Sequence, residues 1–189
     1  MLIRFMLPVT LVAALLPAAV QPLHGQATTP GSGVRLRPSE YAEIPISGRA
    51  VWAASVDSFT SQYDAEKGAR QILGPPNVFP RAGDIGAWTP RTWRSAEDAI
   101  TVRFPATNAR QIWIFETYTA GALHQVFDMS GGRPVLLWSG APAAVGDATT
   151  VRALKIDLRE PRVISALRLV VNPAAVGDYP ALDAVALVP

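Results

Sequence analysis

The chain has 189 residues, of which 49% are apolar and 17% charged, with a formal net charge of +2 and no cysteine. The lack of cysteine excludes a disulfide scaffold, thiolate catalysis, zinc ribbons and iron–sulfur ligation. With only His24 and His124, a multi-histidine metal centre is nearly excluded. The charge is almost balanced, which argues against nucleic-acid binding, and five tryptophans with many aliphatic residues indicate one folded core rather than disorder.

Residues 1–27 have the pattern of a secretory signal peptide. Arg4 makes the start of the chain positive, residues 6–20 are apolar, and Gly25 and Ala27 are small residues preceding a cut after Ala27. The alternative is an uncleaved membrane anchor, but the apolar run is short for a spanning helix, which needs about 20 residues. We therefore predict export to the periplasm or the medium, and no membrane span once the peptide is cleaved.

Residues 28–47 are predicted to be a flexible linker, followed by one folded domain over residues 48–189. The linker begins Thr28-Thr29-Pro30-Gly31-Ser32-Gly33, and this density of Gly, Pro and Ser gives a tether with little core to bury. Its expected role is spacing, or laying an extended segment along the domain.

Short apolar runs separated by turn residues predict that the domain is built from strands. The expected strands are 98–104, 111–118, 122–129, 134–138, 151–158, 163–171 and 182–188. A helix-length periodic segment is absent, apart from one or two turns within residues 64–73. Many short strands with Gly, Asn and Pro turns predict an all-β fold, an antiparallel β-sandwich or jelly roll.

The stretch from residue 61 to residue 97 is not strand-like and is rich in Gly and Pro. A connection this long is usually functional or packed against itself, so it is the first place to seek a site. The candidate ligand-binding residues are Asn77, Arg81, Asp84, Trp88, Arg91, Trp93 and Arg94. Tryptophan can stack on a ligand, and guanidinium matches carboxylate and phosphate oxygens. The alternatives are a core position for the tryptophans and a solvated loop for the arginines.

Several short motifs follow one another along the domain. They are Ser61-Gln62-Tyr63, Leu73-Gly74-Pro75-Pro76-Asn77, Ala87-Trp88, Phe115-Glu116-Thr117-Tyr118 and Leu182-Asp183-Ala184-Val185. Their order and spacing resemble the discoidin-like, galactose-binding-like β-sandwich modules, over residues 53–188. The resemblance implies a non-catalytic module that binds glycans, lipid head groups or proteins through loops at one end of the sandwich.

The same resemblance implies a possible structural calcium near the long loop and the C-terminal strand, with Asp84 and Asp183 as candidate ligands. The alternative is that Asp84 caps a turn beside Gly83 and that Asp183 lies in a solvated or hydrogen-bonded strand end. Glu116 lies among apolar strand residues, where a lone carboxylate is costly to bury. We interpret Glu116 as half of a structural ion pair, with Arg70 as one possible partner.

No assembled catalytic site is recognisable in the sequence. His124, the only histidine after residue 27, lies in a predicted strand, and neither a G-x-S-x-G elbow nor a phosphate-binding glycine loop is present. We therefore predict no enzymatic activity and, calcium aside, no cofactor. The expected function is an exported module that binds a carbohydrate or cell-surface polymer. The alternative is an interaction or structural module that docks on an envelope protein.

Overall fold

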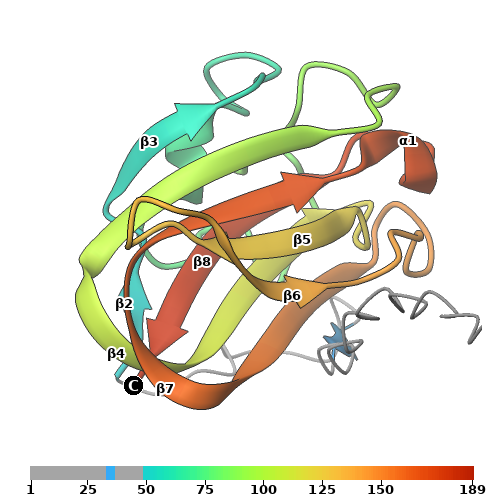
Figure 1. Cartoon of the computed structure of the whole chain (residues 1–189). Coiled ribbons are helices and arrows are strands. Elements are labelled where there is room, and N and C mark those ends of the chain that lie inside the picture. The colour runs from blue at the N-terminus through green and yellow to red at the C-terminus, as the bar shows by residue number, and fades with distance from the viewer. Residues whose placement is uncertain (1–32, 37–48) are drawn as a thin grey trace, which may run out of the picture.

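The computed structural model describes residues 33–36 and 49–189, and the elements found there are mostly strands. The strands are β1 (Gly33–Leu36), β2 (Val51–Trp52), β3 (Ser55–Phe59), β4 (Asp98–Tyr118), β5 (Leu123–Asp128), β6 (Val135–Ser139), β7 (Val151–Val171) and β8 (Ala181–Val188). Every pairing between them is antiparallel, which confirms the predicted all-β antiparallel fold (Figure 1). The described helices are short, and none of them is long and apolar enough to cross a membrane.

The predicted signal peptide lies outside the described residues, as does most of the predicted linker. The described part of the linker is β1, which pairs antiparallel with the first residues of β7, Gly33 opposite Leu154 and Leu36 opposite Val151. This segment therefore lies along the domain as an edge strand.

Two long strands, β4 and β7, run through both layers of the sandwich. The first half of β4 pairs with β3 and with the end of β7, where Ile100 faces Leu169. The second half pairs with β8 and with the start of β7, where Ile112 faces Ile156. Register shifts separate the halves, and each strand carries a proline at its bend, Pro105 in β4 and Pro161 in β7. Because proline has no N–H for the ladder, it interrupts regular pairing there.

The expected strands did not include β1, β2 and β3, all of which precede residue 98. The bends explain a second difference from the sequence prediction. The runs 98–104 and 111–118 were expected as two strands, as were 151–158 and 163–171, but each pair is one continuous strand. One layer contains β3, the first half of β4, the second half of β7, β5 and β6. The other contains β2, β8, the second half of β4, the first half of β7 and β1.

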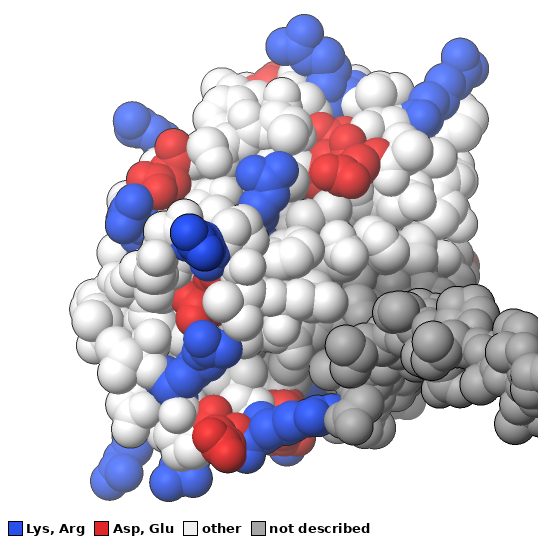
Figure 2. Space-filling model, in the orientation of Figure 1, with Lys and Arg blue, Asp and Glu red and all other residues white. Residues whose placement is uncertain are grey.

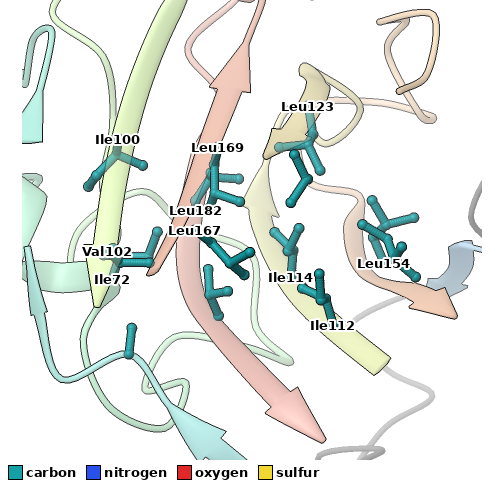
Figure 3. Packing of buried hydrophobic residues seen from close by; sticks show 14 of the residues in the cluster. Ile72, Ile100, Val102, Ile112, Ile114, Leu123, Leu154, Leu167, Leu169 and Leu182 are labelled. Carbon is teal, nitrogen blue, oxygen red and sulfur yellow. The ribbon is translucent and has the colours of Figure 1, made fainter. Parts of the chain in front are cut away.

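The core fills the space between the two layers. Alternate residues of β4 point inward, so Ile100 and Ile112 meet Leu167 and Leu169 from β7 (Figure 3). Leu123 of β5 joins the same cluster. Burying one such side chain stabilises the fold by about 1.5–3 kcal/mol, so this cluster is the main source of stability.

A second apolar cluster lies on the outer face of the β2–β8–β4–β7 layer. Phe79, from the long loop, packs on Phe115 with ring centroids 5.0 Å apart, and Trp52 lies 5.9 Å from Phe115. Val151 and Ala184 complete the contact. Part of the 61–97 stretch is therefore a structural cover, which explains why β4 is apolar on both faces near Phe115.

Two short helices interrupt the strands. The 3₁₀ helix η1 (Ala69–Ile72) lies within residues 64–73, where one or two helical turns were expected. The α-helix α1 (Pro173–Val176) was expected only as a turn. The Asn172 side chain caps it by accepting from the Ala175 N–H at 3.1 Å, Pro173 begins it, and Gly177 ends it in the left-handed conformation.

Gly121, just after β4, is a position where alanine is expected to be poorly tolerated. Its φ is +114°, and an added Cβ would meet the carbonyl oxygen of Ala143, whose N–H donates to the Gly121 carbonyl at 3.1 Å. Gly132 also has a positive φ, +75°, but open space around it. Gly132→Ala should cost about 1–2 kcal/mol of backbone strain, and Gly121→Ala clearly more. Urea unfolding measures the free energy of unfolding of both variants. Equal losses in the two variants would show that the Ala143 backbone moves aside at no cost.

Candidate functional site

Several strand ends meet at one end of the sandwich, together with the segments 60–67, 89–97 and 172–180, which we call the loop end. The start of β4 lies opposite the end of β7, with Asp98 facing Val171, and β5 begins beside the same residue. Backbone hydrogen bonds join the three segments, from Tyr63 N–H to the Thr89 carbonyl at 2.9 Å and from Ala174 N–H to the Ser95 carbonyl at 3.0 Å. In Figure 1 the loop end lies at the top, around the tip of β3 and α1.

A buried polar network supports the loop end. The Asp98 carboxylate, buried at the start of β4, accepts hydrogen bonds from the hydroxyls of Thr60 at 2.6 Å and Ser61 at 2.7 Å. The Ser61 hydroxyl in turn accepts from the Arg91 N–H at 3.0 Å. The Ser61 carbonyl accepts from the indole N–H of Trp88, also at 3.0 Å. These hydrogen bonds tie the base of the 89–97 segment to the start of β4 and to residues 60–61.

Two tyrosines and a lysine pack together at the loop end and form what we call the tyrosine platform, in which Tyr63 is exposed and Tyr179 and Lys67 are half-buried. Tyr63 is 47% exposed, and its ring meets that of Tyr179 edge to face with centroids 5.3 Å apart. Lys67 Nζ lies 4.7 Å from the centre of the Tyr63 ring and 2.6 Å from Asp84 Oδ2. The hydrogen bond to Asp84 raises the pKa of Lys67, so the ammonium stays charged.

The sequence pattern did not indicate the tyrosine platform as a site. Tyr63 entered only as part of a motif, and Tyr179 and Lys67 were not considered. The two tyrosines lie near opposite ends of the domain sequence, and nothing local marks them as neighbours. The nearest signal was the S-Q-Y motif itself, whose tyrosine has an exposed ring.

Arg91, Trp93 and Arg94 form the tip of the 89–97 segment. Both arginines are exposed, and the Arg94 guanidinium lies 5.0 Å from the centre of the half-buried Trp93 ring. Within residues 33–36 and 49–189, neither arginine pairs with a carboxylate. These three predicted residues are thus together at the loop end, and Asp84 is linked to the same end through Lys67.

The other predicted ligand-binding residues lie elsewhere. Asn77 and Arg81 belong to the loop that covers the outer face near Phe79, and the Arg81 guanidinium donates to the Asn77 carbonyl at 3.2 Å. Trp88 is completely buried in the core and forms a bridge with Leu182. The ligand-contacting role considered for Trp88 is therefore corrected to a core role, because neither face of its ring is free.

The calcium candidates Asp84 and Asp183 are engaged by other donors. Asp183 accepts from three backbone N–H groups, those of Asn77, Val78 and Phe79, at 3.3, 3.1 and 2.8 Å. Burial raises the pKa of Asp183, although these amides oppose the shift. Asp84 is occupied by Lys67. Calcium needs six to eight oxygens, so the two side chains as placed do not fit it, and no cluster of three potential metal ligands occurs among the described residues.

Glu116 forms the expected structural ion pair, but with Arg152 rather than Arg70. Glu116 and Arg152 lie directly opposite each other on β4 and β7, and their side chains make a buried salt bridge. The second Glu116 oxygen accepts from the Gly121 N–H at 2.9 Å. Arg70 was the wrong partner because it lies on η1, exposed, whereas strand register decides which side chains face each other.

No protein-family model matches the sequence, and no curated protein matches it. Among solved structures, XRCC1 bound to the DNA pol beta catalytic domain superposes with a TM-score of 0.56 and 12% identity, over 73% of this chain and 97% of that chain. The family 32 carbohydrate-binding module of C. perfringens NanJ, in complex with galactose, has a TM-score of 0.52 and 12% identity, over 73% of this chain and 98% of that chain. Allantoicase from Saccharomyces cerevisiae has a TM-score of 0.51 and 11% identity, over 70% of this chain and 39% of that chain.

Identities this low show a shared fold and nothing finer. The XRCC1 and NanJ structures are covered almost completely, so this chain corresponds to a whole structural unit of each, whereas it spans well under half of allantoicase. Together with the antiparallel strands and the core between two layers, these similarities show that the chain has a galactose-binding-like β-sandwich fold.

Proposed function

We propose that this protein is an exported, non-catalytic module that binds carbohydrate through its loop end. The observation that carries the proposal is the tyrosine platform. An exposed aromatic ring, held from the side by a second ring, offers a large rigid surface to the apolar face of a sugar at little cost in conformational entropy. Lys67 adds a charged donor beside Tyr63 that can bind ligand hydroxyls.

Three further observations support the proposal. The network of Asp98, Thr60 and Ser61 preorganises the loop end, which lowers the entropy lost on binding. The NanJ module has the same fold and was solved with galactose bound. His124, on β5, has its Nδ1 3.0 Å from the Gly140 carbonyl, so this ring nitrogen contacts the backbone rather than a side-chain nucleophile. Export rests on the pattern of residues 1–27.

Tyr63→Ala is expected to weaken carbohydrate binding about tenfold, because it removes the exposed ring of the platform. A glycan array identifies a ligand for the wild-type protein, and isothermal titration compares the variants on it. Tyr63→Phe is the matched control, since it keeps the ring and should keep most of the affinity. Equal affinity in Tyr63→Ala and the wild type would contradict the proposed site.

Failure to bind any glycan on the array would instead favour the docking alternative. β6 is an edge strand, and it presents Val135 and Leu136 at 43% and 46% exposure. An edge strand with exposed apolar side chains can accept a strand from a partner protein.

A further inference from the structure

We infer that the carbohydrate bound at the loop end is acidic, and that Arg91 and Arg94 bind its carboxylates. The inference rests on the proposed function and specifies its ligand class. The face of the protein in Figure 2 carries interspersed basic and acidic side chains and no continuous basic surface. The position of the two arginines, and not an overall positive charge, is therefore the basis for an acidic ligand.

The two arginines are held by their backbone, which leaves their side chains available. The Arg91 N–H donates to the Ser61 hydroxyl at 3.0 Å, and the Arg94 N–H donates to the Thr92 hydroxyl at 3.2 Å. The Arg94 guanidinium is also held over the Trp93 ring, a contact that orients it without using its N–H donors. Both groups therefore keep their forked donor edges free for a ligand.

Among the described residues, no carboxylate forms a salt bridge with either of these two arginines. Elsewhere in the described residues, Arg103, Arg152 and Arg162 each pair with an aspartate or glutamate. At the loop end, Asp98 already accepts from two hydroxyls and Asp84 is paired with Lys67. The segments of the loop end also carry Asp64, Glu66, Glu97 and Asp178, and none of the salt bridges among the described residues joins one of these carboxylates to Arg91 or Arg94. Arg91 and Arg94 thus present two positive charges, three residues apart, on a segment whose base is rigid.

The tyrosine platform and the arginines lie on two segments of the loop end that are hydrogen-bonded to each other. The hydrogen bond from Tyr63 N–H to the Thr89 carbonyl places the platform beside the segment that leads to Arg91. In the proposed complex, one sugar ring stacks on Tyr63 and the substituents of a neighbouring sugar contact the arginines. Guanidinium binds a carboxylate through two parallel hydrogen bonds, which makes a uronic-acid polymer the ligand class that uses both features.

The test compares alginate, a polymer of uronic acids, with alginate whose carboxylates have been reduced to alcohols. Binding to the full-length protein is measured by isothermal titration. We expect the wild type to prefer alginate at least tenfold, and each of Arg91→Gln and Arg94→Gln to lose about tenfold on alginate alone. Arg94→Lys keeps the positive charge but not the two parallel N–H donors of the guanidinium. Its affinity for alginate should lie between those of the wild type and Arg94→Gln. Arg159→Gln, an exposed arginine at the bend of β7, is the charge-matched control and should bind like the wild type.

The outcomes separate this inference from the proposed function. Equal binding of both polymers, with a loss in Tyr63→Ala, would overturn the acidic ligand but leave carbohydrate binding intact. An equal loss in Arg159→Gln and Arg91→Gln would show non-specific charge attraction and overturn the inference. Binding to phosphatidylserine vesicles through Arg91 and Arg94, with no binding to alginate, would overturn it in favour of a membrane surface.

Discussion

Glu116→Ala is expected to lower the free energy of unfolding by about 3–5 kcal/mol. The Glu116 carboxylate is only 1% exposed, and it neutralises the largely buried guanidinium of Arg152. The Arg152 Nη2 already lacks a hydrogen-bond partner among the described residues, so removing Glu116 leaves a buried charge almost without compensation. The Gly121 N–H would lose its acceptor at the same time.

Chemical denaturation of the variants tests this expectation. Glu116→Gln keeps an acceptor for Gly121 but removes the charge, so its loss should be smaller than that of the alanine variant. Asp57→Ala is the control, because it removes an exposed ion pair with Arg103 that water and salt screen. The denaturation midpoint of this variant should be close to that of the wild type. A Glu116→Ala protein as stable as Asp57→Ala would show that water enters and solvates Arg152.

Asp183→Ala is expected to cause the second large loss in the free energy of unfolding, about 3 kcal/mol or more. The Asp183 carboxylate holds the backbone N–H groups of Asn77, Val78 and Phe79, and buried amides left without an acceptor carry their full desolvation cost. The loop should also separate from the outer face, which would expose Phe115. Urea unfolding gives the free energy, and limited proteolysis reports cleavage near residue 79. A stable variant resistant to protease would show that Phe79 packing alone holds the loop.

The same carboxylate predicts a pH dependence of defined sign. Burial raises the pKa of Asp183 above that of the unfolded chain. The stability linked to its protonated form is thus fully present below the usual aspartate pKa and is lost as the pH rises through the folded-state value. Relative to Asp183→Asn, which cannot ionise, wild-type stability should fall over that interval. A constant difference between the two proteins across the acidic range would contradict the raised pKa.

Much of the fold could be predicted from the sequence because strand burial has a short period. The alternation of apolar and polar residues over 98–104 and 151–158 indicates which side chains point to the core. The apolar run around Phe115 correctly indicated burial on both faces of the strand. The continuity of β4 and β7 could not be predicted, because a proline interrupts the hydrogen-bond ladder in the same way whether the strand ends or bends.

The candidate site was predictable only in part, for a related reason. A single segment carries Arg91, Trp93 and Arg94, so local composition was enough to select them. The platform needs Tyr63 beside Tyr179, and the loop clamp needs Asp183 beside Phe79, 104 residues away. Residue types along the chain set the strands, the core faces and the exposed arginines. Which distant side chains meet was decided by strand register and loop packing, because these contacts form only when the two layers close on the core.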